Sequence, residues 1–183
     1  NKMKKEIYQK IEIPENITAE INGDLLKIIG PEGEVKKRFD TEHLEFKKEG
    51  NKIIVGNKKS TKREKKMMNT IKSHIQNMIK GVQKKFEYHL KVCFNHFPIT
   101  IEIKGEDVLV KNFLGEKVSR KTKIPEGVQV EINRDIIKVK SSNKELAGQV
   151  AANFETMTKI RNKDRRVFQD GIFIINKKGR ETP

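Results

Sequence analysis

Apolar residues follow two different periods along the chain. Up to residue 60 they alternate with polar residues in short runs bounded by Gly, Pro and Asn, which is typical of strands that bury one face. From residue 61 to residue 80 they recur every three or four positions, which predicts an amphipathic helix. Alternation resumes at Phe86. The pattern therefore predicts strands, a helix, and then the same succession again.

The first half is expected to hold short strands and one helix. Asn22-Gly23 predicts a tight hairpin, because both residues tolerate the positive φ of a two-residue turn. The helix is expected over Thr61–Lys80, since Thr61-Lys-Arg-Glu64 has the form of a capping box and Gly81 stands where a left-handed C-terminal cap is common. The expected strands are Lys5–Ile13, Ile17–Ile21, Leu26–Ile29, Val35–Phe39, Leu44–Phe46 and Ile53–Val55.

The second half shows the same order of elements. A second capping box is expected at Ser142-Asn-Lys-Glu145, before a helix with Leu146, Val150, Phe154 and Met157 on its apolar side. The expected strands are Phe86–Phe94, Ile99–Ile103, Val108–Val110, Lys117–Lys121, Val128–Ile132, Ile136–Val139 and Ile172–Ile175.

The two halves also match residue by residue. With an offset of 82 positions, Ile17-Thr-Ala-Glu-Ile21 aligns with Ile99-Thr-Ile-Glu-Ile103 and Gly23 with Gly105. Matching strands, turns and helix starts in one order predict a tandem repeat. The expected fold class is α+β, with similar domains over 1–82 and 83–183, each an antiparallel or mixed sheet covered by one helix. The expected joint between them comprises Asn77, Met78, Gly81 and Val82.

The net charge suggests a partner class. The 183 residues include 40 Lys and Arg against 25 Asp and Glu, a formal charge of +15. Such an excess favours a polyanionic partner, of which nucleic acid is the commonest. A basic surface that merely keeps the protein soluble is the alternative.

The excess charge lies mainly in two segments. Residues 58–72 carry a net charge of +6 at the start of the first helix, where the helix dipole disfavours cations. We interpret Lys58, Lys59, Lys62 and Arg63 as a candidate secondary basic surface; a solvated lysine face is the alternative.

Residues 159–180 also carry +6, in a segment that mixes Arg with Asn162, Gln169 and Phe168. Arg presents a planar fork that grips phosphate oxygens or stacks on a base, so this segment is the main candidate for RNA contact. The alternative is a disordered basic linker.

No constellation predicts catalysis. His89 and Cys93 lie four residues apart on an expected strand with His96 nearby, but they lack a fourth ligand and the spacing of a zinc site. Gly30-Pro-Glu-Gly33 lacks the Lys-Ser/Thr of a phosphate-binding loop. We therefore expect no enzyme, no metal and no cofactor. The single cysteine fits a reducing compartment, and neither a membrane span nor a secretory signal is predicted.

Several longer motifs resemble one known family. The chain is similar to the universal large-subunit ribosomal protein six family (eukaryotic large-subunit protein nine), in its archaeal–eukaryotic branch, and most like archaeal members. The motifs are Ser73–Val82 (SHIQNMIKGV), Phe86–Leu90 (FEYHL), His96–Pro98 (HFP), Asn112–Lys117 (NFLGEK), Ala151–Asn153 (AAN) and Phe168–Ile172 (FQDGI). They span nearly the whole chain in the family's order.

The resemblance implies a structural role in the cytoplasm, on the large ribosomal subunit. It implies two αβ domains, with the second as the principal rRNA-binding one, placed near the sarcin–ricin loop and the base of the factor-binding stalk. The implied partners are large-subunit rRNA, neighbouring ribosomal proteins and nearby translation factors. The candidate rRNA-binding residues are Lys159, Arg161, Asn162, Lys163, Arg165, Arg166, Lys177, Lys178, Arg180, Lys117 and Arg120. An RNA-binding module that acts outside the ribosome is the alternative function.

Overall fold

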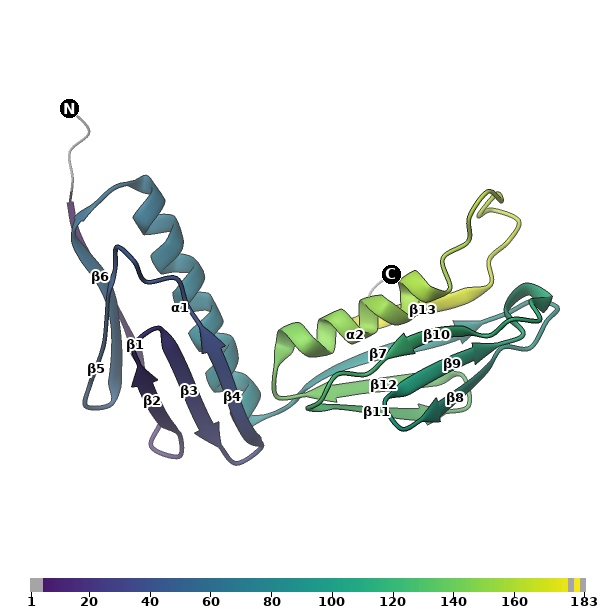
Figure 1. The fold of residues 1–183 in the computed structure, drawn as a ribbon, viewed down its shortest axis with the longest axis horizontal. Helices are drawn as coiled ribbons and strands as arrows, with labels where there is room; N and C mark the ends of the chain where they lie inside the picture. The colour runs from purple at the N-terminus through teal and green to yellow at the C-terminus, as the bar shows by residue number, and fades with distance from the viewer. Residues whose placement is uncertain (1–4, 178–179, 182–183) are drawn as a thin grey trace. The chain divides into compact units, whose positions relative to one another are not determined.

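A computed structural model describes residues 5–177 and 180–181. The chain forms two compact units, residues 1–85 and 86–183, so the division falls three residues after the expected boundary. Each unit contains two antiparallel sheets and one long helix (Figure 1). The predicted tandem α+β architecture is confirmed, with two sheets in each domain where one was expected.

In the first domain, two three-stranded sheets share one helix. One sheet has the order β1-β6-β5, with β1 (Lys5–Glu12), β6 (Lys52–Ser60) and β5 (Glu45–Glu49). The other has the order β2-β3-β4, with β2 (Thr18–Asn22), β3 (Leu25–Gly30) and β4 (Gly33–Arg38). Helix α1 (Lys62–Gln83) packs on β6, β3, β1 and β4.

Alternation along the strands explains the first core. Leu26 and Ile28 of β3 and Ile53 and Val55 of β6 point inward and have no exposed surface, while their sequence neighbours face outward. Burying each such side chain contributes roughly 1.5–3 kcal/mol. The apolar stripe of α1 completes this core with Met68, Ile71, Ile75, Met78, Ile79 and Val82.

The two ends of α1 differ from each other in how well the sequence predicts them. The capping box at its start is confirmed, since the backbone N–H of Thr61 donates to a Glu64 carboxylate oxygen at 2.8 Å and the N–H of Arg63 donates to the Thr61 hydroxyl at 3.2 Å. The prediction of a left-handed cap at Gly81 is wrong. The helix continues to Gln83, and its C-terminal cap is Lys84, which is in an extended conformation.

A tertiary contact explains the longer helix. The backbone N–H of Glu32 donates to the carbonyl of Val82 at 2.9 Å, and the glycine backbone at position 30 lies against the Val82 side chain. The last turn of α1 is thus held by the β3–β4 turn. Met78, Gly81 and Val82, expected at a joint, are buried in the first domain, and Asn77 lies half-buried on the same helix.

The second domain repeats this plan and adds to it. One sheet has the order β10-β9-β8, with β8 (Thr100–Lys104), β9 (Asp107–Lys111) and β10 (Arg120–Lys123). Helix α2 (Lys144–Met157) packs on the other sheet and on β10. That other sheet has the order β11-β12-β7-β13-β14, from β7 (Phe86–Cys93), β11 (Val128–Asn133), β12 (Ile136–Ser141), β13 (Gly171–Lys177) and β14 (Arg180–Glu181).

Chain order relates the two domains. The β11-β12-β7 part of the second domain corresponds to β5-β6-β1 of the first, and β8–β10 correspond to β2–β4. Strand β13 is the addition: it follows α2 and pairs antiparallel with β7. The second core lies beneath α2, around Leu90, Ile137, Phe154 and Ile172.

Two local predictions in the second domain are wrong. The N-cap of α2 is Asn143 and not Ser142, since the Asn143 side chain accepts from the N–H of Glu145 at 3.0 Å. The preceding turn is held by the hydroxyl of Ser141, which accepts from the N–H of Asn143 at 3.1 Å. The strand expected from Lys117 begins at Arg120. The segment before it contains a 3-10 turn, η1 (Phe113–Gly115), flanked and interrupted by residues with positive φ.

Candidate RNA-binding surface

Several cations on the sheets are paired with neighbouring carboxylates. Lys27 and Lys36 lie 3.1 and 2.9 Å from oxygens of Glu34, and their hydrogen bonds, that of Lys36 foremost, hold its pKa below the usual range. Lys111 binds Glu102 at 2.6 Å and lowers the pKa of that carboxyl in the same way. The positive charge of these lysines is therefore compensated where it arises.

The cations between α2 and β13 are different. We call residues 158–170 the basic loop. Lys159, Arg161, Lys163 and Arg165 are exposed on it, and none of them lies within 4 Å of a carboxylate in the described part of the chain. Arg166 alone is paired, at 2.8 Å from Asp164, and its hydrogen bond lowers the pKa of that carboxyl. Asn162 is also exposed and adopts a positive φ of 55°.

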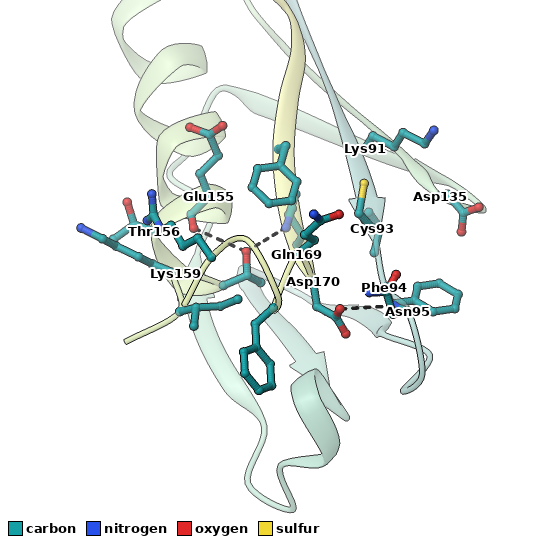
Figure 2. A pocket seen from close by; sticks show the side chains of 17 residues that line it. Lys91, Cys93, Phe94, Asn95, Asp135, Glu155, Thr156, Lys159, Gln169 and Asp170 are labelled. Atoms are coloured by element: carbon teal, nitrogen blue, oxygen red, sulfur yellow. Dashed lines mark hydrogen bonds between the residues drawn. The ribbon is translucent and has the colours of Figure 1, made fainter. Parts of the chain in front are cut away.

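The basic loop is anchored at both ends, so it is not a disordered linker. At its start, the buried hydroxyl of Thr158 accepts from the N–H of Ile172 at 2.9 Å and donates to the carbonyl of Phe154 at 3.3 Å. At its end, the buried carboxylate of Asp170 accepts from the N–H of Asn95 at 3.3 Å, as Figure 2 shows.

Its middle is ordered by local contacts. The Lys163 ammonium lies 4.5 Å from the centre of the Phe168 ring, and the N–H groups of Val167 and Phe168 both donate to the carbonyl of Asp164, at 3.1 and 2.9 Å. A loop held in this way presents its cations at defined positions, which lowers the conformational entropy lost when a ligand binds.

A hollow lies on each side of the basic loop. The first, of about 910 Å³, is bordered by Lys91, Phe94, Arg165 and Phe173 and appears in Figure 2. Three carboxylates border it, those of Asp135, Glu155 and Asp170. Two of them are engaged, since Glu155 accepts from the N–H of Ile174 at 2.9 Å and Asp170 from the N–H of Asn95 at 3.3 Å.

The second hollow, of about 830 Å³, is bordered by more cations. They are Arg120, Lys121, Lys159, Arg161 and Lys163, with Glu116 as the one acid beside them. Thr156, Lys159 and Ile160 border both hollows, so the start of the loop separates them. Lys121 was not among the sequence-based candidates, and the alternation of β10 could have pointed to it as an outward-facing cation.

Arg120 has a positioning role within the protein. It donates to the Glu116 carboxylate at 2.8 and 2.6 Å and to the carbonyl of Met157 at 2.7 Å, and its guanidinium lies 4.4 Å from the centre of the Phe113 ring. These contacts tie β10 to the end of α2 and lower the pKa of Glu116. Arg120 therefore shapes the second hollow while most of its donors are already used.

Of the remaining predicted residues of this domain, only Lys117 has a described side chain. Lys117 is exposed in the segment before β10 and borders neither hollow. Lys178 lies outside the described residues. The backbone of Lys177 pairs with that of Arg180 in the terminal hairpin, and the side chains of both lie outside the described part of the structure.

In the first domain, the predicted cations lie on two elements. Lys58 and Lys59 are exposed near the end of β6, and Lys62 and Arg63 are exposed on the first turn of α1. With the exposed Lys65 and Lys66, they form no ion pair to any described residue. Lys62, Lys65 and Lys66 also border a shallow hollow of about 520 Å³ that continues along the helix past Asn69 and Ser73.

Comparison with known proteins gives the family. The model of the family described as ribosomal protein L6 matches the chain twice, over residues 13–85 and 97–171. The chain belongs to the ribosomal protein L6 family. Each match lies within one of the two structural units, and the second includes the whole basic loop.

Archaeal members of the family are similar along nearly their full length, as the resemblance implied. The large ribosomal subunit protein uL6 of Staphylothermus marinus is 47% identical over 174 residues, which is 93% of this chain and 94% of that protein. The protein of the same name from Methanococcus vannielii is 42% identical over 174 residues, 95% and 96% of the two chains. That of Saccharolobus solfataricus is 41% identical over 172 residues, 93% and 95%.

In residues 5–177 and 180–181, no group of three His, Cys, Asp or Glu side chains is arranged to hold a metal ion. His89 instead lies 3.6 Å from Glu87, and the ring of His96 packs against Phe97. No helix in the described segments has the length and apolar content needed to cross a membrane.

Proposed function

We propose that this member of the L6 family is a structural component of the large ribosomal subunit, and that its second domain binds large-subunit rRNA through the basic loop. The observation that supports this most is the contrast in pairing. Four exposed cations without an ion pair to any described residue gather on one short anchored loop: Lys159, Arg161, Lys163 and Arg165. By contrast, strand lysines such as Lys27 and Lys111 are neutralised by a neighbouring carboxylate.

Phosphate contact explains why such cations would be kept. Each Lys or Arg that neutralises a phosphate releases condensed counterions, which supplies most of the affinity for RNA and makes it depend on salt. Arg161 and Arg165 add planar forks that hold two phosphate oxygens at once. The two hollows beside the loop give room for an RNA strand on either side, so shape supplies selectivity.

Location and role rest on family resemblance. We place the protein near the sarcin–ricin loop and at the base of the factor-binding stalk, beside other large-subunit proteins and close to translation factors. There it supports assembly of the subunit and translation in the cytoplasm. It does so as a structural protein and not as an enzyme, in keeping with relatives that are named for the large ribosomal subunit.

The test compares two variants with the same change in charge. The loop variant lacks three cations without ion pairs and carries Lys159→Gln, Arg161→Gln and Arg165→Gln. The control variant lacks three paired lysines of the same domain and carries Lys104→Gln, Lys111→Gln and Lys140→Gln. Binding to deproteinised large-subunit rRNA is measured from low to high salt. We expect the loop variant to lower the slope of log affinity against log salt by about 2–3 and the control to change it little. Equal slopes in the two variants would refute the assignment of the loop.

A second measurement separates the ribosomal role from the alternative. A structural component of the subunit stays with large subunits through a high-salt wash and sedimentation. An RNA-binding module that acts outside the ribosome would be released by the wash, and that result would overturn the proposed location.

A further inference from the structure

A polar stripe along α1 has no part in the function proposed so far. Its members recur at intervals of three and four residues, so they lie on one side of the helix, away from the apolar side that fills the core. We call them the α1 stripe: Lys62, Lys65, Lys66, Asn69, Thr70, Ser73 and Asn77. The stripe runs from Lys62 to Asn77, which is about 22 Å along the helix axis at a rise of about 1.5 Å per residue.

The stripe begins with uncompensated cations. Lys62, Lys65 and Lys66 are exposed and form no ion pair with any residue that the structure describes, and Lys58, Lys59 and Arg63 add charge beside them. The nearest acid, Glu64, is held in the capping box, where the hydrogen bond with the Thr61 hydroxyl lowers its pKa. Cations at this end oppose the helix dipole, so they weaken the helix slightly. Such a cost is commonly retained where function requires it.

The rest of the stripe is short, polar and close to the helix axis. The hydroxyl of Thr70 donates to the carbonyl of Lys66 and that of Ser73 to the carbonyl of Asn69, both at 3.0 Å, so both side chains fold back on the helix. Their oxygens keep acceptor capacity toward solvent. Asn69 accepts from the Gln9 amide of β1, which fixes its orientation. The result is a shallow hollow, lined by short polar side chains and by the alkyl parts of the lysines, that a polymer can approach closely.

We infer that the α1 stripe is a second RNA-binding surface, which takes the sugar–phosphate backbone of double-stranded RNA. Lys, Ser, Thr and Asn are the side chains that commonly contact phosphate and sugar. The wide minor groove of an A-form helix displays 2′-hydroxyl groups between two phosphate rows, and duplex RNA is recognised largely through them. The lysines fit a phosphate row, and the hydroxyl and amide groups fit the 2′-hydroxyls.

Two other partners fit the stripe less well. The centre of a protein interface is rich in aromatic residues, Met and Arg and poor in Lys and Ser, which is the reverse of this composition. An amphipathic helix binds a membrane by inserting its apolar side, and in α1 that side is buried against β3 and β6. This inference goes beyond the rRNA contact of the basic loop, since it concerns another domain and other residues.

The electrostatic part is tested with the full chain and a 20-base-pair RNA duplex as the probe. The stripe variant carries Lys62→Gln, Lys65→Gln and Lys66→Gln. The control variant removes three ion-paired lysines of the same domain through Lys27→Gln, Lys36→Gln and Lys52→Gln. We expect the stripe variant to lower the salt slope by about 2–3 and the affinity by at least roughly tenfold at low salt, with little change in the control. Equal losses in both variants would show a general charge effect only and would overturn the inference.

The role of the polar side chains in the α1 stripe is tested by comparing an RNA duplex with a DNA duplex. Asn69→Ala with Ser73→Ala should reduce binding to the RNA duplex several-fold and leave binding to a DNA duplex of the same sequence almost unchanged, because only RNA carries the 2′-hydroxyl. A stronger effect on single-stranded RNA, or tight binding of the wild type to anionic vesicles that the stripe variant loses, would contradict duplex recognition.

The assignments of the two RNA-binding surfaces can be refuted independently of each other. The loop variant, with an intact stripe, should keep its stripe-dependent binding to the RNA duplex. If the loop variant behaves as wild type and the stripe variant does not, the function proposed for the second domain is wrong and the present inference stands. If the stripe variant behaves as wild type and the loop variant does not, the assignment of the loop stands and the inference about the α1 stripe is wrong.

Discussion

In the first domain the cations of the candidate surface lie along a helix, whereas in the second they lie on the loop that follows one. The repeated parts of the two domains, three strands beside three strands with a helix across them, carry both paired lysines, such as Lys27, Lys111 and Lys140, and lysines without an ion pair to a described residue, such as Lys121. The two candidate surfaces lie on segments that differ between the domains. Helix α1 has 22 residues against 14 in α2, and only α2 is followed by a loop and an added strand, β13.

This difference shows how a duplicated fold can acquire different surfaces. Both cores are built from closely packed, buried apolar side chains of the strands and the helix, so neither core can differ much without loss of packing. Exposed positions beyond the matched strands are free of that constraint. We therefore interpret the shared architecture as the source of stability, and we propose that the segments that differ between the domains determine what each domain binds.

The largest expected effect tests whether each domain rests on its own core. Phe154 of α2 and Ile75 of α1 have no exposed surface. Phe154→Ala should destabilise the second domain by about 3–5 kcal/mol, and Ile75→Ala the first by about 2–5 kcal/mol, because each leaves a cavity. Hydrogen exchange of each variant should show lost protection only in the altered domain. Equal loss in both domains would mean that they unfold as one unit, and the comparison between them would fail.

An intermediate effect is expected where the basic loop is anchored. Thr158→Val keeps the shape of the side chain but leaves the buried N–H of Ile172 without its acceptor, which costs about 1–3 kcal/mol. Faster exchange of the Ile172 amide and weaker binding to large-subunit rRNA should appear together. Thr156→Val is the matched control, since Thr156 is exposed beside the same loop. Unchanged rRNA binding in Thr158→Val would show that the anchor does not order the cations.

The smallest effect compares the two helix starts and depends on pH. Glu64 has a lowered pKa, chiefly through its hydrogen bond with the Thr61 hydroxyl, while α2 is capped by the neutral Asn143. A lowered folded-state pKa gives stability that is present above the unfolded pKa of about 4.3 and is lost as the pH falls through the folded-state value. In thermal unfolding, Glu64→Gln should therefore be less stable than wild type at neutral pH, with the difference closing in acid.

The matched change at α2 should behave differently. Asn143→Ala should cost about 0.5–2 kcal/mol, and this cost should not change as the pH is lowered, since Asn143 does not titrate. A pH-independent difference for Glu64→Gln would contradict the charged capping box.

Local patterns predicted more of the fold than of the candidate site. Strands and helices follow periods of two and 3.6 residues, which the sequence displays directly, and the repeat followed from them. The end of α1 was missed because it depends on a carbonyl of Val82 that bonds to Glu32, 50 residues earlier in the chain.

Site residues were harder to judge because pairing is a tertiary property. Arg120 resembles a free cation in the sequence, yet its donors are taken by Glu116 and by the carbonyl of Met157. Lys65 and Lys66 were counted in the basic run without being named as site residues, although both face the same hollow as Lys62. Charge runs locate a basic region, and only the fold shows which of its cations are uncompensated.

We propose that cations without an ion pair, and not basic residues in general, contact rRNA. This claim is tested most directly by acetylation of lysines with mass-spectrometric readout, on the free protein and on assembled large subunits. Lys159, Lys163, Lys62, Lys65 and Lys66 should be protected in the subunit, while the paired Lys36, Lys52 and Lys104 should stay as reactive as in the free protein. Equal protection of both groups, or protection of the paired lysines alone, would contradict the claim.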